Sequence, residues 1–323
     1  MNPKEEFSLD KSPYDLTTFY GRLRHYMNVT DPSTLLYSDE KINESMNVLK
    51  KYKETGIMCG NVEDMWTYRK IVEATIHPVT SEIIPKPFRV SAIAPVNIPI
   101  VFGMLTCPSS NVIGTLGLHW INQSYNTACN YANRSGSSQS IESLAKAYVL
   151  AVGSACTFAY GLGKVVERFP SKWKSLSLIV PCVATAAANI SNISFTRLDE
   201  ITNGAPVTDI EGVNRGLSKV AGTQAVMQSA LTRCVLVPCA CLMLPPALMS
   251  AIRYIRLMPS NPRGVMLLEL SVIYLSLQAA LPAALAVYPQ NITLKCNELE
   301  NQFHNLKLSD GTIVKELYSN KGL

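Results

Sequence analysis

The sequence predicts an all-α, polytopic membrane protein with about five transmembrane helices, preceded by an N-terminal amphipathic helical region. Of its 323 residues, 47% are hydrophobic and only 16% are charged, and the mean hydropathy is +0.12. No Asp, Glu, Lys or Arg occurs in residues 90–133, 147–163, 175–196, 234–252 or 270–294. About 20 predominantly apolar residues cross a bilayer as a helix, so each segment is a candidate span. A large soluble helical core is the alternative, but soluble helices of this length need a charged face.

These segments divide the chain into three regions: a polar helical region over residues 1–89, a transmembrane domain over 90–294, and a C-terminal tail over 295–323. The expected spans are residues 92–118, 147–163, 175–196, 230–252 and 268–289. If residues 90–133 cross once, Lys and Arg are more numerous in loops on the N-terminal side. Loops rich in Lys and Arg stay on the inner side of a membrane, so the N-terminus is expected there. Five spans then put the two termini on opposite sides.

The N-terminal region carries signals for two amphipathic helices. Ser38 is a plausible N-cap and Gly56 a plausible stop for the first, and the second fits residues 61–77 before Pro78. Apolar residues recur at helical spacing in both, namely Ile42, Met46, Leu49 and Tyr52, then Met65, Tyr68 and Val72. We expect these helices to lie against the membrane domain or its surface.

The loop between the third and fourth expected spans is rich in glycine. Gly204, Gly212 and Gly216 are turn signals, and they predict a short strand-like hairpin near residues 206–209.

A stripe of polar, uncharged side chains marks the end of the longest charge-free segment. On a helix its members fall at spacings of three and four: His119, Asn122, Gln123, Asn126, Asn130 and Asn133. Amides supply donors and acceptors without net charge, which matches a zwitterionic amino acid. The alternative is that the stripe joins helices, because buried amides in lipid need partners.

Other candidate binding residues lie in or beside the remaining spans. Arg233 is the one ionisable side chain other than cysteine in residues 220–252, and a buried Arg there could hold a carboxylate, pair with an acid or snorkel. Asn97 lies between two prolines, and Asn189 and Asn192 share a face of the third span. Prolines free backbone carbonyls that can line a cavity.

Several classes of function lack support in the sequence. The net charge of +5 is modest and forms no basic stripe, which sets nucleic-acid binding aside. The four histidines are scattered and no C-x-x-C pair occurs, so no metal site is expected. No Walker or dinucleotide glycine loop and no catalytic constellation is visible, so we expect neither an enzyme nor a cofactor.

Six blocks stand out in collinear order: FYGRLRHYMNVTDPSTLL, HPVTSEII, PVNIPIVFGML, HWINQSYNTACNYANRSG, AANISNISFTRLDEITNGAPVTDIEG and the terminal YSNKGL. Together they resemble the sideroflexin family of mitochondrial inner-membrane proteins. The stretches ALTRCVLVPCACLMLPPALMS and NYANR are most similar to the branch once named tricarboxylate carriers. Matching family-motif positions are His77, Pro78, Thr80, Glu82, Arg197, Glu200 and Asp209. Three positions depart from the family pattern, with Val79 replacing an acid, Ser81 replacing a small or amide residue, and His119 replacing an aromatic residue.

The resemblance implies a five-span carrier of serine or a similar small neutral amino acid, feeding one-carbon metabolism. It also implies the mitochondrial inner membrane, where the loop charges favour an N-terminus in the matrix and a C-terminus in the intermembrane space. Two alternatives stay open. One is a citrate or tricarboxylate carrier, in which Arg134, Arg197 and Arg233 converge; the other is a non-transporting scaffold for respiratory complex assembly. The expected partners are therefore a small-molecule substrate and the lipid bilayer, and the sequence leaves the oligomeric state open.

Overall fold

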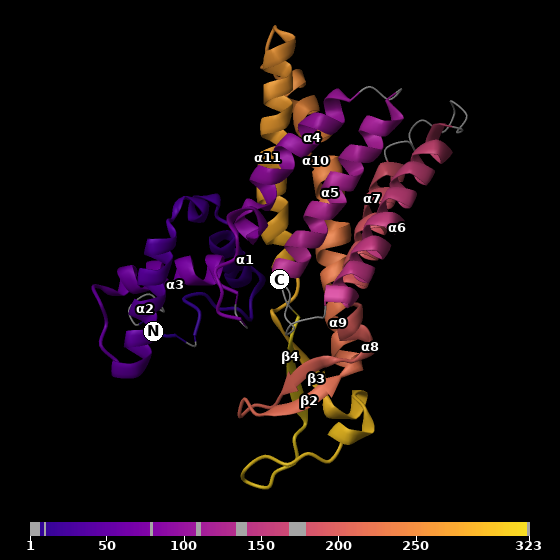
Figure 1. Ribbon diagram of the computed structural model, residues 1–323. Helices are drawn as coiled ribbons and strands as arrows, with labels where there is room; N and C mark the ends of the chain where they lie inside the picture. Colours follow the sequence, from indigo (N-terminus) through magenta and orange to yellow (C-terminus); the bar gives the residue numbers. More distant parts are fainter. Residues whose placement is uncertain are drawn as a thin grey trace. The chain divides into compact units, whose positions relative to one another are not determined.

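The computed structural model describes residues 7–9, 11–77, 80–107, 111–133, 141–167 and 179–321, and Figure 1 shows their elements. The chain forms two compact units. One comprises Met1–Phe102 and Leu244–Pro289, and the other comprises Gly103–Met243 and Gln290–Leu323. Neither unit is continuous in sequence, so each is built partly from distant segments.

The first unit consists of helices. Its N-terminal part contains α1 (Phe19–Val29), η1 (Pro32–Leu36), α2 (Asp39–Thr55), α3 (Val62–Thr75), η2 (Lys86–Phe88) and η3 (Val90–Ala92). It also includes most of α4 (Ile93–Thr106), the end of α10 (Val237–Tyr254) and α11 (Pro262–Leu285). Ile42 from α2, Ile71 from α3 and Ile76 are buried together and form a small core.

The two amphipathic helices predicted near the N-terminus are confirmed as α2 and α3. The Ser38 hydroxyl accepts a hydrogen bond from the Lys41 backbone N–H, and Gly56 ends α2 in the left-handed conformation with φ 69°. Asn61 caps α3 through a reciprocal capping box with Asp64. These caps satisfy N–H groups that lack partners inside the helix, which is why short polar residues mark both starts.

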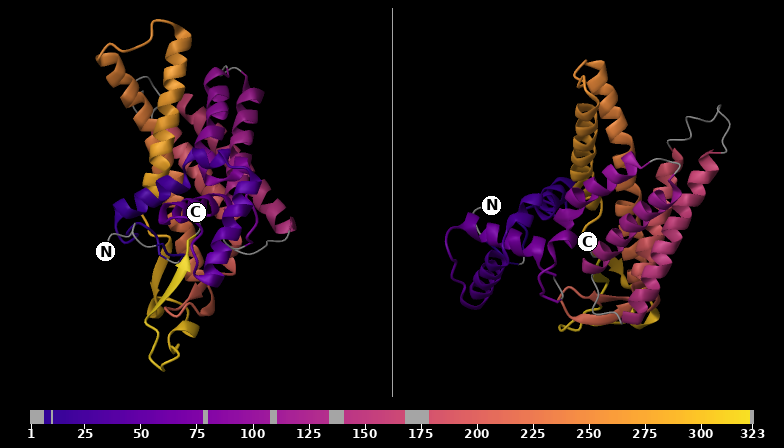
Figure 2. Two further views of the ribbon diagram at one scale, coloured as in Figure 1. Left: turned by 90° about the vertical axis from the view of Figure 1, so that its left-hand side faces the viewer. Right: turned by 45° about the horizontal axis from the view of Figure 1, so that its top comes forward.

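The second unit combines long helices with a small sheet. Its helices are α5 (Val112–Ala132), α6 (Ile141–Glu167), α7 (Ile179–Thr196), α8 (Leu198–Thr202) and α9 (Lys219–Ser229), which continues through the π-helix η5 (Ala230–Leu236) into α10. Helices α5, α6 and α7 pack side by side (Figures 1 and 2). The stretch expected to form one span over residues 92–118 instead contains all of α4 and the first turns of α5.

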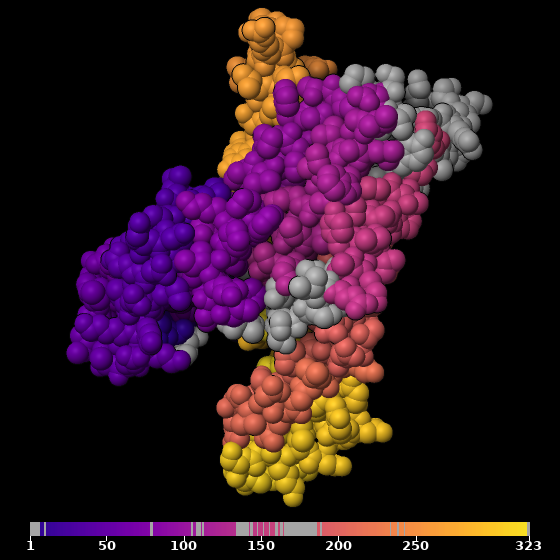
Figure 3. Space-filling model, in the orientation of Figure 1, coloured from indigo at the N-terminus to yellow at the C-terminus, as the bar shows by residue number. Residues whose placement is uncertain are grey.

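An antiparallel sheet corrects the all-α prediction. Strands β1 (Ala205–Thr208) and β2 (Asn214–Ser218) form the hairpin that the glycines predicted. The C-terminal tail adds β4 (Glu316–Asn320), preceded by β3 (Asn291–Lys295), and the order is β2-β1-β4-β3. The 3-10 turns η6 (Cys296–Glu298) and η7 (Asn301–Phe303) follow β3. Hairpin and tail form one continuous surface (Figure 3).

A buried core holds this sheet together. It contains Val207 from β1, Leu294 from β3, Leu317 from β4, Ala221 and Ala225 from α9, and Phe303 from the tail. Exposed and buried residues alternate along β3 and β4, as the period of two in a strand requires. The tail is therefore part of a folded layer.

Two helical stretches are long and apolar enough to cross a membrane by length and composition. One is the continuous helix Lys219–Tyr254 and the other is α11, Pro262–Leu285. Shorter apolar helices cover Val90–Met104 and Tyr148–Phe158.

Candidate functional site

The polar stripe on α5 divides into two edges. Gln123, Thr127 and Asn130 face α7, where they form hydrogen bonds with Asn189 and Asn192. His119, Asn122 and Asn126 lie on the neighbouring part of the helix surface, roughly 60° away at about 100° per residue. The stripe therefore consists of one edge that faces α7, with Gln123, Thr127 and Asn130, and a second edge with His119, Asn122 and Asn126.

Asn192 is the centre of the edge that faces α7. Its side chain is 1% exposed, and its amide nitrogen lies 2.9 Å from the Thr127 hydroxyl and 3.3 Å from the Gln123 Oε1 atom. The same nitrogen lies 3.2 Å from the Gln123 backbone carbonyl, and the Asn192 Oδ1 atom accepts from Asn130 at 3.3 Å. Gln123 also reaches Asn189 at 3.4 Å. These contacts satisfy polar groups that would otherwise be unpaired among apolar side chains, so this edge joins α5 to α7.

The other edge has no such partners. His119, Asn122 and Asn126 are half-buried, and their side chains have no hydrogen-bond partner among the residues that the structure describes. At the end of the stripe, the Asn133 amide donates to the Cys129 carbonyl of its own helix at 2.8 Å. The first three side chains can therefore hydrogen-bond to a ligand without first breaking a bond to the protein.

A second group with unused hydrogen-bonding capacity lies just before the π-helix. The Gln228 Oε1 atom is buried and lacks a partner within the described part of the chain. In the following turn, the Thr232 hydroxyl donates back to the Gln228 carbonyl at 2.9 Å. The π-helix η5 packs against α7, and such segments inside α-helices are frequent at functional sites.

Two predicted binding residues have a different status. The Asn97 amide donates to the Ile93 carbonyl of its own helix at 2.7 Å and belongs to the first unit. Arg233 lies within η5, but its side chain is outside what the structure describes. Prolines lie inside helices that continue through them, at Pro99 in α4, Pro245 and Pro246 in α10, and Pro282 in α11.

The family-motif residues Arg197 and Glu200 form a buried ion pair next to α7. The Arg197 Nε and Nη2 atoms lie 2.9 Å and 2.5 Å from the two oxygens of Glu200. The Arg197 Nη1 atom donates to the Ser229 hydroxyl at 3.0 Å, and Nη2 donates to the Lys321 carbonyl at 2.9 Å. The guanidinium therefore ties the end of α7 to α9 and to the end of β4.

Asp209 is the acid of a second, separate pair in the hairpin. Burial acts to raise its pKa, but backbone N–H groups, including that of Val213, and the ion pair with Arg215 at 2.5 Å lower the pKa below its usual value. These bonds fix the turn between β1 and β2. Asp209 is therefore committed to local structure.

The HPVTSE block forms a tight turn. The Glu82 carbonyl accepts from the His77 backbone N–H, and the His77 carbonyl accepts from the Ser81 N–H, both at 2.9 Å. Ser81 has φ 57°, and the His77 ring nitrogen Nδ1 accepts from the Thr80 N–H at 3.2 Å. Thr80 and Glu82 are exposed, while Pro78 lies outside the described residues. These contacts give the described part of the block a structural role.

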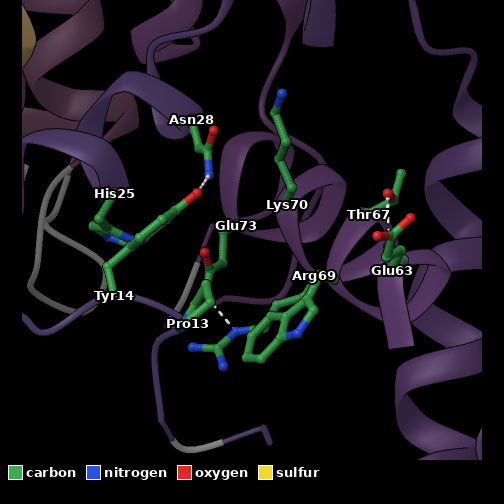
Figure 4. A pocket seen from close by; sticks show the side chains of 10 residues that line it. Pro13, Tyr14, His25, Asn28, Glu63, Thr67, Arg69, Lys70 and Glu73 are labelled. Atoms are coloured by element: carbon green, nitrogen blue, oxygen red, sulfur yellow. Dashed lines mark hydrogen bonds and ion pairs between the residues drawn. The ribbon is translucent and has the colours of Figure 1, made fainter. Parts of the chain in front are cut away.

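A cavity of about 300 Å³ lies in the N-terminal part of the first unit (Figure 4). Its basic side chains are already paired, Lys70 with Asp31 at 2.5 Å and Arg69 with Glu73 at 2.7 Å. Burial lowers the pKa of His25, which lies beside them. Sequence reasoning did not identify this cavity, and its cations are not free to hold an anion. No group of three or more His, Cys, Asp or Glu side chains suited to a metal occurs within the described ranges.

Long apolar helices, prolines within them and a charge-free amide network between helices are typical of a helical membrane protein. The chain belongs to the sideroflexin family, because the family profile described as Sideroflexins matches residues 8–323.

Curated relatives agree over nearly the full length. A sideroflexin from Dictyostelium discoideum is 38% identical over 317 residues, covering 96% of this chain and 95% of the relative. Human sideroflexin-5 is 35% identical over 323 residues, which cover 98% of this chain and 93% of the relative. Human sideroflexin-3 is 30% identical over 321 residues, which cover 98% of each chain. No solved structure matches the chain.

Proposed function

We propose that the protein is a carrier of small neutral amino acids, with serine as the expected substrate, in the mitochondrial inner membrane. The observation that carries the proposal is the edge of α5 formed by His119, Asn122 and Asn126, whose half-buried side chains have no partner in the described part of the chain. Neutral donors and acceptors suit a zwitterion, whose ammonium, carboxylate and hydroxyl groups each need a hydrogen-bond partner. Serine imported in this way would feed one-carbon metabolism.

The substrate carboxylate requires a donor of its own, and Arg233 is the proposed one. It is the single cation in the sequence from residue 220 to residue 252, and it occurs in the π-helix that packs against α7. A guanidinium can bind a carboxylate through two parallel hydrogen bonds, which a lysine cannot reproduce.

Citrate is a weaker candidate because one of the three arginines proposed for it is already occupied. All three nitrogens of the Arg197 guanidinium donate to Glu200, Ser229 or the Lys321 carbonyl. A tricarboxylate would need several free cations. Because Arg197 is already engaged by the protein, a substrate with no net charge is favoured.

Helix length supports about five full membrane crossings. At about 1.5 Å per residue, α5, α6, α7, Lys219–Tyr254 and α11 each span roughly 27 Å or more. Helix α4 alone is roughly 21 Å long, and the preceding η3 turn extends it toward the roughly 30 Å of the hydrocarbon core.

One contact revises the proposed arrangement of the termini. Arg22 of α1 donates to the Ala286 carbonyl at 2.7 Å, at the C-terminal end of α11. If α11 crosses the bilayer, the N-terminal region and the residues after α11 share one side, in place of the opposite sides expected from loop charges. Residues 90–133 would then cross twice, through α4 and α5, so that the short helix α4 is a sixth crossing beside the five longer helices. The loop-charge count assumed a single crossing by residues 90–133 and does not apply to this arrangement, in which an N-terminus in the matrix places the C-terminus in the matrix too.

Uptake of labelled serine into liposomes that contain the purified protein tests the proposal. We expect saturable uptake that excess citrate does not inhibit. Arg233→Lys should fold normally and raise the KM for serine, because the two-point contact with the carboxylate is lost. Uptake of labelled citrate without uptake of serine would favour the tricarboxylate alternative, and transport of neither solute by folded protein would favour the assembly scaffold.

A further inference from the structure

Helix α1 presents an apolar face to its surroundings. Tyr20 is 76% exposed, Met27 56% and Phe19 40%, while Leu23 between them is half-buried. On a helix these four positions fall within one arc of roughly 100°, so they form a continuous face. Phe19 and Tyr20 pack edge to face, with ring centroids 5.9 Å apart.

The remainder of α1 is anchored in the first unit. Tyr26 is 1% exposed and Val29 is 5% exposed. Gly21 packs so closely on the preceding segment that an added Cβ would lie 1.8 Å from the Asp15 carbonyl oxygen. The apolar face is therefore held outward by a well-packed opposite side.

Hydrogen bonds fix α1 beside the last turns of α11. The Arg22 Nε atom donates to the Ala286 carbonyl at 2.7 Å, and Nη2 donates to the Val287 carbonyl at 3.4 Å. At the other end of α1, the Thr30 carbonyl accepts from the Gln278 amide at 3.0 Å. A cation at carbonyls that the helix itself leaves unpaired is favourable, because the C-terminal end of a helix is electronegative.

These contacts set the depth of α1. Helix α11 has 24 residues and is about 36 Å long, whereas the hydrocarbon core is about 30 Å thick, so its final turn reaches the headgroup level. Gln278 lies roughly two turns, or about 12 Å, before Ala286. Helix α1 thus runs alongside the part of α11 that passes from the headgroups into the acyl chains.

We propose that α1 is an interfacial helix whose face of Phe19, Tyr20, Leu23 and Met27 inserts into one lipid leaflet. The proposal rests on the proposed crossing of the membrane by α11. Aromatic side chains with a polar tip prefer this depth, and exposed Arg24 at the edge of the face can reach anionic headgroups. An apolar face at this level therefore fits lipid better than water.

Photocrosslinking of the full-length protein in liposomes tests this inference. Benzoylphenylalanine is placed singly at position 20 or 27 on the face, at exposed Leu267 of α11, and at exposed Lys50 of α2 as the matched control. Each variant must elute as monodisperse folded protein. We expect lipid adducts at positions 20, 27 and 267. At position 50, the yield of lipid adducts should not exceed the background level.

The outcomes separate this inference from the proposed function. One outcome is that lipid adducts form at position 267 but not at positions 20 and 27. This would overturn the interfacial assignment of α1 and would still support the crossing by α11. Protein adducts at these positions would show that another surface covers α1. Absence of lipid adducts at position 267 would contradict the crossing by α11, and with it the membrane arrangement of the carrier.

Discussion

Replacement of Asn192 by alanine should destabilise the protein far more than the same replacement at Asn126. The Asn192 amide supplies two N–H groups and one accepting oxygen to the network between α5 and α7. Hydrogen bonds between membrane helices average about 0.6 kcal/mol, so the loss of three corresponds to about 2 kcal/mol. Asn126 has no hydrogen-bond partner in the described part of the chain, and its loss should change stability by less than about 0.5 kcal/mol.

Unfolding in mixed detergent micelles, followed by circular dichroism, measures both free energies under one condition. The two variants are a matched pair, because each exchanges one asparagine for alanine in a helix that carries the polar stripe or faces it. Equal destabilisation by the two substitutions would refute the division of the stripe into a joining edge and a free edge.

Three further predictions concern the ion pair and the sheet. Glu200→Gln should cost about 3 kcal/mol of unfolding free energy, since it leaves the buried Arg197 guanidinium without its counter-charge; an unchanged unfolding midpoint would contradict this. Leu317→Ala should cost about 2–5 kcal/mol, because Leu317 is fully buried in the sheet core; loss below about 1 kcal/mol in the same assay would show that the strand is not packed as described. Burial acts to raise the pKa of Glu300, but hydrogen bonds from the Ser218 hydroxyl and from backbone N–H groups at the start of α9 lower it below its usual 4.5. This stabilisation is therefore present above about pH 4.5 and lost as the pH falls, so the unfolding midpoint of Glu300→Gln should depend less on pH there than that of the unaltered protein.

Local signals in the sequence identified the elements whose boundaries depend on one or two residues. Ser38 and Gly56 located α2, because a hydroxyl cap and a left-handed glycine are requirements of the helix itself. Gly204 and Gly212, both with positive φ, marked the hairpin for the same reason. Such features are readable because their physical cause lies within a few residues.

The sheet was only half predictable because its remaining strands depend on distant partners. The central pairing joins Thr208 to Tyr318, far apart in sequence. Strands β3 and β4 are five residues each and include polar side chains, so their alternation is too short to identify them alone. Helix α1 was not predicted for a different reason, because Arg22 and Arg24 interrupt the apolar pattern along its sequence.

The sequence located the polar stripe but not its division. Residue spacing shows which side chains share a face of α5, whereas the rotation of that face relative to α7 decides which of them are paired. Asn192 was predicted to line the same cavity as Asn126. In the structure it has three hydrogen-bonding neighbours, Gln123, Thr127 and Asn130. Arg197 likewise gave no sign in the sequence of its contact with the carbonyl of Lys321.

The most direct measurement is the concentration dependence of serine uptake by Asn126→Ala and Asn133→Ala in liposomes. Both substitutions lie on the same face of α5, but the Asn133 amide is satisfied by its own helix. One hydrogen bond to the substrate is worth about 0.5–1.5 kcal/mol, so Asn126→Ala should raise the KM for serine roughly 2- to 13-fold while Asn133→Ala leaves it unchanged. Identical KM values in both variants and the unaltered protein would contradict a substrate site on this edge.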